Sequence, residues 1–141
     1  LGELGGGFQI NGGYAYLDAK VVRDTNAAAI GQRALYLPKN TFSAFGIYAP
    51  EDGSLKGFSI GGGVRYVDSV RTSYTGTTID IPKYTIVDGS LGYEQGDWSI
   101  QLNIQNILDE TYFINNYQTL LYGNMVGDPR NVSLTFMKRW H

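Results

Sequence analysis

The stretch Trp98-Ser99-Ile100-Gln101-Leu102-Asn103-Ile104-Gln105 decides the fold. Its apolar and polar residues alternate without exception, so a β-strand here places every apolar side chain on one face and every polar one on the other. The same period of two recurs in residues 8–16, 58–67, 87–94 and 131–140. A sixth, less regular segment lies at residues 41–49, and we therefore predict about six strands of an all-β, antiparallel protein.

Two local features depart from simple alternation. In the segment 41–49, the apolar Phe45 and Ile47 fall on the face opposite to Phe42. The run Gly61-Gly62-Gly63 lies inside an alternating strand, and no Gly-Lys-Ser/Thr follows it. Close backbone approach or a bend therefore explains the glycines better than a phosphate-binding loop does.

Composition excludes several classes of function. With 43% hydrophobic residues, 17% charged residues and a formal net charge of -2, the chain is neither disordered nor a basic nucleic-acid binder. It has no cysteine, and its one histidine is the terminal His141. We therefore expect no disulfide framework, no metal site, no catalytic residues and no enzyme. Nineteen glycines and eleven tyrosines instead favour strands, tight turns and aromatic girdles.

Connections between the predicted strands alternate strictly between long and short. The long ones cover residues 21–39, 68–82 and 107–129, and the short ones surround residues 50–53 and 94–97. Transmembrane barrels show this rhythm, because short turns lie on the periplasmic side and long loops lie outside the cell. Polar side chains on the second face also suit a wet lumen better than a dry core. We predict a transmembrane β-barrel segment that is part of a larger barrel or closes with another protein, since about six strands are too few alone.

Five stretches form a recognisable series. They are Asn11-Gly12-Gly13-Tyr14-Ala15-Tyr16-Leu17-Asp18-Ala19-Lys20, Leu37-Pro38-Lys39-Asn40-Thr41, Gly61-Gly62-Gly63-Val64-Arg65-Tyr66-Val67, Leu102-Asn103-Ile104-Gln105-Asn106-Ile107-Leu108-Asp109-Glu110-Thr111-Tyr112 and Gly127-Asp128-Pro129-Arg130-Asn131-Val132. In this order and at this spacing they resemble the C-terminal part of TonB-dependent siderophore receptors of the ferrichrome or hydroxamate type. The resemblance covers nearly the whole chain.

The resemblance implies an outer-membrane barrel of about 22 strands filled by an N-terminal plug. Residues 1–141 would form roughly the last six strands, as one partial domain without the plug. Residues 1–4 would end the preceding strand, and Gly5-Gly6-Gly7 would be its periplasmic turn.

The implied function is transport in the bacterial outer membrane. Such a receptor binds a ferric siderophore outside the cell and imports it with force transmitted by the TonB complex. The segment that TonB grasps would lie in an N-terminal region missing from this chain. The resemblance implies no directly bound cofactor, with the ferric siderophore as transported ligand, and the lipid bilayer and the barrel-assembly machinery as further partners.

Aromatic and cationic residues of the long connections are the candidate ligand contacts. They are Tyr117, Tyr112, Tyr122, Arg33, Tyr36, Arg71 and Tyr74. Tyr117 is near the position at which hydroxamate-type receptors, by the resemblance, contact the ligand through an aromatic residue of the last loop. The arginines and tyrosines of the two earlier loops could add cationic or aromatic contacts to an anionic ferric chelate. The alternative for each residue is a solvated loop, or one that only packs on its neighbours.

Two further features have structural interpretations under the resemblance. Asp109 with Tyr112, after Asn103 and Asn106, resembles the family's strand-to-loop corner, where Asn and Asp side chains satisfy local backbone groups. Phe136 and Trp140 resemble the aromatic end of the last strand, which acts as the assembly signal, although His141 follows the final aromatic residue.

Two other functions stay open. The chain could be a barrel-assembly substrate or an excised fragment that pairs its edge strands with the assembly machinery or with itself. It could also be a small autonomous barrel with lipid-modifying or proteolytic activity, which would need a convergent polar triad.

Overall fold

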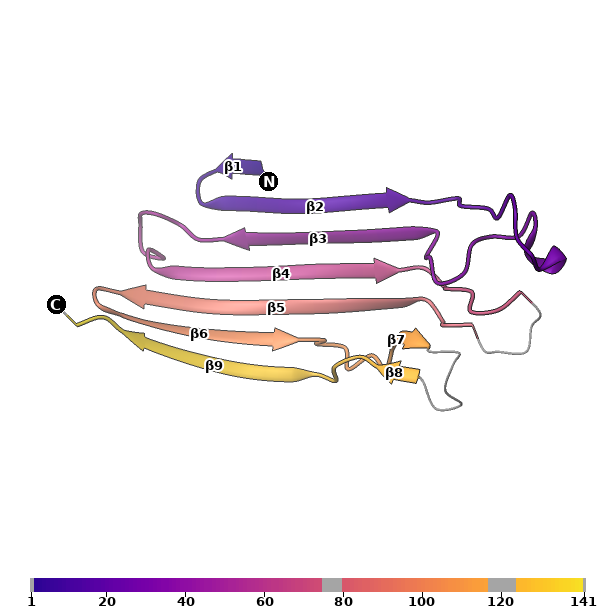
Figure 1. Ribbon diagram of the computed structural model, residues 1–141. Coiled ribbons are helices and arrows are strands. Elements are labelled where there is room, and N and C mark those ends of the chain that lie inside the picture. The colour runs from indigo at the N-terminus through magenta and orange to yellow at the C-terminus, as the bar shows by residue number, and fades with distance from the viewer. Residues whose placement is uncertain (1, 75–79, 117–123, 141) are drawn as a thin grey trace.

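The computed structural model describes residues 2–74, 80–116 and 124–140, and the architecture is all-β (Figure 1). One antiparallel sheet holds seven strands in the order β1-β2-β3-β4-β5-β6-β9. Their bounds are β1 (Gly2–Gly5), β2 (Phe8–Tyr16), β3 (Asn40–Tyr48), β4 (Phe58–Val67), β5 (Tyr84–Gln95), β6 (Trp98–Gln105) and β9 (Asn131–Lys138). A second, two-stranded sheet joins β7 (Phe113–Asn116) to β8 (Asn124–Val126), and a short 3-10 helix, η1, spans Ala27–Ala29. The described residues form no helix that is long and apolar enough to span a bilayer.

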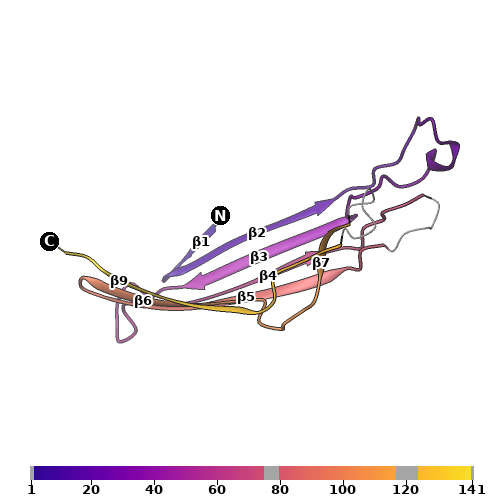
Figure 2. The ribbon, with the colours of Figure 1, turned by 60° about the horizontal axis from the view of Figure 1, so that its bottom comes forward.

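All six predicted strands lie in the large sheet. The seventh, β1, is the end of the preceding strand that the resemblance implied, and Gly6 and Gly7 form the turn after it with φ values of 60° and 85°. β5 begins at Tyr84, three residues earlier than the alternation indicated. The sheet is a single curved layer, which Figure 2 shows nearly edge-on. The fold is therefore part of a barrel wall.

The long and short connections lie at opposite ends of the sheet (Figure 1). The first, second and third long loops are residues 17–39, 68–83 and 106–130. Short turns join β1 to β2, β3 to β4, and β5 to β6 at the other end. The predicted alternation is therefore confirmed, and the three long loops are placed side by side.

One face of the large sheet is apolar and exposed. The register aligns Ile60, Leu91, Leu102 and Leu134 across β4, β5, β6 and β9. Leu91 is 51% exposed and Leu134 is 67% exposed. A contiguous apolar row of this kind costs free energy in water, so this face is suited to contact with hydrocarbon.

The opposite face is mostly polar. The register aligns Ser59, Gly92, Gln101 and Thr135 across the same four strands. Phe45 and Ile47 of β3 also lie on this face, paired with Gly63 and Gly61 of β4. A Cβ atom on Gly63 would lie 2.9 Å from Phe45 Cδ2, so the missing side chain leaves room for the ring. This close approach confirms the interpretation of the glycine run and explains why β3 alternates poorly.

Aromatic side chains gather at both ends of the apolar face. Near the long loops the register aligns Tyr14, Phe42 and Tyr66. Near the short turns, Phe8 stacks on Tyr48 with ring centroids 4.2 Å apart, and Phe58 lies 4.4 Å from Tyr93. Residues 58 and 66 are separated by about 26 Å along β4. This separation is similar to the height of the apolar band of outer-membrane barrels, about 25 Å.

Candidate ligand-binding loops

The first long loop folds back on itself beyond the end of the sheet. The amide of Ala34 donates a hydrogen bond to the carbonyl oxygen of Ala19 at 2.9 Å. Nearer its tip, Asn26 Oδ1 accepts a hydrogen bond from the amide of Ala28 at 3.1 Å and so caps η1. Ala29 is completely buried. This loop is therefore an ordered extension of the wall.

The second long loop has a small core of its own. Val70 and Ile81 form an antiparallel bridge, and both side chains are buried. The amide of Thr72 donates to Asp80 Oδ1 at 3.2 Å, and Thr72 is completely buried. These contacts hold the two arms of the loop together next to the sheet.

Three of the predicted ligand contacts, Arg33, Tyr36 and Arg71, lie where the first and second long loops meet. Arg33 Nη2 donates to the carbonyl oxygen of Ser69 at 3.2 Å. Arg71 Nη1 donates to Gln32 Oε1 at 2.9 Å. The Tyr36 hydroxyl donates to a main-chain carbonyl of the second loop at 3.3 Å. Polar atoms of all three side chains thus join one loop to the other, which favours the packing alternative for these residues.

The third long loop begins at a hydrogen-bonded corner built around Asn106, which is 2% exposed. Asn106 Oδ1 accepts from the amide of Glu110 at 2.9 Å, and Asn106 Nδ2 donates to the carbonyl oxygens of Glu110 and Asp128 at 2.9 and 3.2 Å. Its own amide donates to Asp88 Oδ1 at 2.9 Å. The structural interpretation of this corner is therefore confirmed.

The base of the third long loop is closed by an aromatic contact. The Tyr112 ring is buried, lies 4.6 Å from the Tyr84 ring and covers Gly127, where a Cβ atom would overlap the Tyr112 ring. The amide of Gly127 donates to the Tyr112 carbonyl oxygen at 2.8 Å. Asp109 Oδ1 accepts a bond from the amide of Arg130 at 3.0 Å. Tyr112 therefore holds the loop's base, which agrees with its place in the predicted strand-to-loop corner.

A cavity of about 200 Å³ lies where the loops meet. Apolar and aromatic side chains line it, among them Tyr36 from the first loop, Val70 and Ile81 from the second, Phe113 and Ile114 from the third, and Tyr84 from the start of β5. The sequence pattern does not reveal this cluster, because period-two alternation does not extend into irregular connections. The available signal was Val70 and Ile81, an apolar pair near the two ends of the second long loop.

The remaining predicted contacts are placed as follows. Tyr74 is half-buried in the second long loop and is the last residue of the described range 2–74. Tyr117 and Tyr122 lie outside the described residues. Among the described residues, no group of three or more His, Cys, Asp or Glu side chains is arranged to hold a metal ion.

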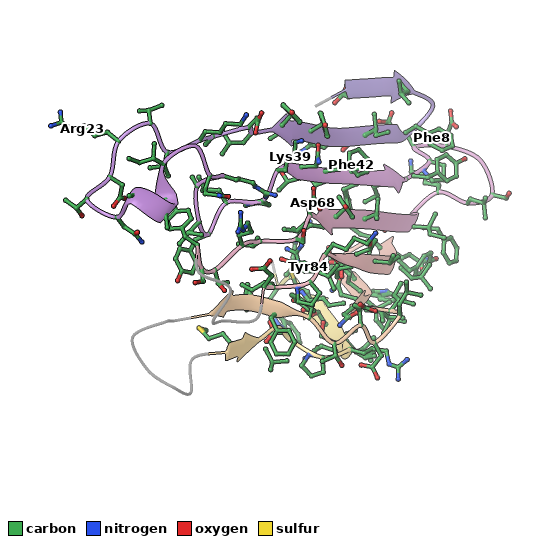
Figure 3. All side chains as sticks on the ribbon, turned by 90° about the vertical axis from the view of Figure 1, so that its right-hand side faces the viewer. Phe8, Arg23, Lys39, Phe42, Asp68 and Tyr84 are labelled. Atoms are coloured by element: carbon green, nitrogen blue, oxygen red, sulfur yellow. The ribbon has the colours of Figure 1, made fainter. Side chains whose placement is uncertain are left out.

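A polar network marks the end of the sheet below the loops. The Tyr14 hydroxyl donates to Asn40 Oδ1 at 2.7 Å, and Asn40 Nδ2 donates to Asp68 Oδ2 at 2.9 Å. The bond from Asn40, together with one from the amide of Ser69, holds the pKa of the Asp68 carboxyl below its usual value. Asp68, labelled in Figure 3, follows β4 directly and is thus kept ionised at the root of the second long loop.

The two residues of the predicted assembly signal lie in and after β9. Phe136 pairs with Ile100 and is 65% exposed on the apolar face. Trp140 is 82% exposed, and Lys138 Nζ lies 4.2 Å from the centre of its ring. His141 lies outside the described residues. Both aromatic side chains are therefore accessible in this structure.

Comparison with known families gives a match over residues 2–107. The matching family is described as "TonB dependent receptor-like, beta-barrel". It covers β1 to β6 and the first two long loops.

Relatives with curated names are receptors. The chain is similar to the metal-pseudopaline receptor CntO of Pseudomonas aeruginosa, with 31% identity over 135 residues that make up 95% of this chain and 19% of that receptor. It is similar to the ferrioxamine B receptor of Salmonella typhimurium, with 33% identity over 117 residues, 79% of this chain and 16% of the receptor. The chain therefore spans about a fifth of the length of the curated relatives it matches.

Solved structures agree on the fold. The ferric-catecholate import receptor Fiu of Escherichia coli K12, in its closed form, superposes with a TM-score of 0.82 at 25% identity. The superposition covers 97% of this chain and 19% of that one. The fold of this chain is thus similar to that of about a fifth of a larger solved receptor.

Proposed function

Because this chain belongs to the TonB-dependent receptor β-barrel family, whose members are transport receptors of the outer membrane, we propose that it forms the C-terminal barrel segment of a ferric-siderophore receptor. The observation that carries the proposal is a sheet with one exposed apolar face and three long loops gathered at a single end. The apolar face would contact lipid, and the polar face would line the lumen around the plug.

The three long loops would form part of the ligand's entrance. Tyr117 and Tyr122 are the proposed aromatic contacts in the third loop, and Tyr74 is the proposed contact in the second. Arg33, Tyr36 and Arg71 would have to exchange loop-to-loop bonds for bonds to the ligand, and Tyr112 would have to leave a buried position. We therefore propose Tyr117, Tyr122 and Tyr74 as the first candidates for direct contact with the ligand.

The proposed ligand class is a ferric hydroxamate. The motif resemblance supports this class, as does the similarity to a ferrioxamine B receptor. Energy for import would come from the TonB complex acting on the plug, and the assembly machinery would recognise Phe136 and Trp140.

Uptake of radiolabelled iron by the full-length receptor, expressed in a receptor-deficient strain, tests this function. The probes are ferrioxamine B, ferrichrome and a catecholate complex of iron. We expect saturable, TonB-dependent uptake of the hydroxamates, and a severalfold higher KM for Tyr117→Ala. Phe58→Ala, at the opposite end of the sheet, is the matched control and should leave KM unchanged. Uptake of the catecholate alone would contradict the hydroxamate class, and no uptake of any probe would contradict the receptor function.

One observation favours the assembly-substrate alternative. Within the described residues, β1 and β9 each pair with a strand on one side only. An open edge in a bilayer is costly, so the chain produced alone would need a partner. Stable co-isolation of the isolated chain with the assembly machinery, abolished by Phe136→Ala, would support this alternative, and a free monomer would contradict it.

A further inference from the structure

The contact between the first and second long loops includes a strained backbone conformation at Tyr36. Tyr36 has a φ of 61°, a left-handed conformation that bulky residues rarely adopt. Two other described non-glycine residues have positive φ, Asn106 and Asp109, and both are residue types that tolerate it. Strain of this kind persists only where the surrounding contacts stabilise it.

The left-handed turn directs Tyr36 at the second long loop in two ways. Its amide donates to the carbonyl oxygen of Arg71 at 2.9 Å, and its hydroxyl donates to the carbonyl oxygen of Thr72 at 3.3 Å. The ring also lines the cavity shared with Val70 and Ile81. One residue of the first loop thus binds two consecutive residues of the second.

Two arginines also join the same two loops. Arg33 reaches from the first loop to the carbonyl oxygen of Ser69 at 3.2 Å, and Arg71 reaches from the second loop to Gln32 Oε1 at 2.9 Å. The bonds run in both directions, so neither loop can shift without breaking bonds made by the other. The third loop is anchored to β5 by the bond from Asn106 to Asp88, and its Phe113 and Ile114 line the same cavity as Tyr36.

We propose that Arg33, Tyr36 and Arg71 are positioning residues that join the first long loop to the described parts of the second, residues 68–74 and 80–83, as one rigid body. This inference rests on the proposed function, because the rigid body would form one side of the ligand's entrance. The three residues then act on ligand affinity through the shape of that side and do not need to touch the ligand. A change in one loop is therefore expected to alter the position of the other.

Amide hydrogen exchange of the full-length receptor without ligand tests the coupling directly. Arg71→Ala removes a side chain of the second loop only. We expect it to speed exchange of first-loop amides, Tyr36 included, by about fivefold to tenfold. Arg23→Ala is the matched control, because Arg23 lies at the far tip of the first loop, away from the sheet (Figure 3). It should leave exchange around residue 36 unchanged.

Two further variants separate coupling from general loosening. Arg71→Lys keeps one donor for Gln32 and should restore at least part of the protection of the first loop. Gln32→Ala combined with Arg71→Ala should speed exchange no more than Arg71→Ala alone, because the pair shares one bond. Exchange in β5 and β6 should stay at the wild-type rate, which shows that the barrel is folded. Faster exchange confined to the second loop, or additive effects of the two alanines, would overturn the proposal.

Transport adds a second readout, with ferrioxamine B as the probe. Arg71→Ala should raise KM while leaving kcat within twofold, and Arg71→Lys should recover most of the affinity, since a positioning role needs the bond to Gln32 and not a contact with the ligand. An unchanged KM despite the loosened loop would overturn the role in binding. If the wild-type receptor imports no probe, the proposed function fails, and the exchange experiment still decides whether the loops are joined.

Discussion

Replacing Leu91 by Arg tests which face of the sheet contacts lipid. Leu91 lies in the apolar row between Ile60 and Leu102 and is 51% exposed. It is two residues from Tyr93, so it lies about 7 Å along β5 inside the aromatic residues near the short turns. An Arg on the lipid face costs about 2–4 kcal/mol at the middle of the bilayer and about 0–1 kcal/mol near its surface.

Because Leu91 lies between the middle of the bilayer and its surface, we expect Leu91→Arg to lower the free energy of unfolding by about 2 kcal/mol. This corresponds to a roughly 30-fold shift of the unfolding equilibrium. The assay is urea unfolding of the full-length receptor in lipid bilayers, followed by tryptophan fluorescence. Gln101→Arg is the matched control, because Gln101 is adjacent to Leu102 in β6 and lies on the opposite, polar face. Equal losses for Leu91→Arg and Gln101→Arg, or a larger loss for Gln101→Arg, would refute the assignment of the faces.

Three further predictions follow from local geometry. Gly63→Val places a Cβ 2.9 Å from Phe45 Cδ2 and should cost about 1–3 kcal/mol in the same unfolding assay, with most of the loss recovered in combination with Phe45→Ala. Asn106→Ala leaves buried backbone groups of the third loop's corner unpaired and should cost about 2–3 kcal/mol; limited proteolysis of the loop should become faster, and unchanged cleavage would contradict this. Because the folded-state pKa of Asp68 lies below its unfolded value, its stabilisation is present above a pH of about 4 and is lost as the pH falls through the folded pKa. The protection factors of second-loop amides, which correct for the slower intrinsic exchange at low pH, should therefore decrease as the pH falls in the wild type. Asn40→Ala should weaken this dependence because it removes the main cause of the lowered pKa, and the same pH dependence in both would contradict it.

The strands could be predicted because a barrel wall repeats one simple rule. Successive side chains of a strand point alternately to hydrocarbon and to the lumen. The sequence of residues 98–105 therefore shows the pattern by itself, whatever strands lie beside it. The rule fails where one strand packs on another, as at Phe45, which lies on the polar face because Gly63 leaves it room. The sequence of β3 alone therefore does not show that Phe45 packs against Gly63 of β4.

The loops were predictable in position and composition but not in contacts. Arg33, Tyr36 and Arg71 were predicted as candidate ligand contacts, and the sequence does not show that they bond to the neighbouring loop. Tyr112 was predicted both as part of the strand-to-loop corner and as a candidate ligand contact, and it is buried against Tyr84. Contacts of this kind depend on which loops the sheet brings together, and that follows only from the strand order.

The contact of Tyr112 with Gly127 has a consequence for how such receptors diversify. It closes the third long loop at its base, with the ring covering a position where only glycine fits. The stability of the strands should therefore depend little on the number of residues between Tyr112 and Gly127, since lengthening a closed loop adds little entropic cost. Under the proposed function, insertions, deletions and recombination within that segment would change the ligand preference while the strands stay as they are. Natural variation is thus expected to be concentrated above the closure and to stop abruptly at it.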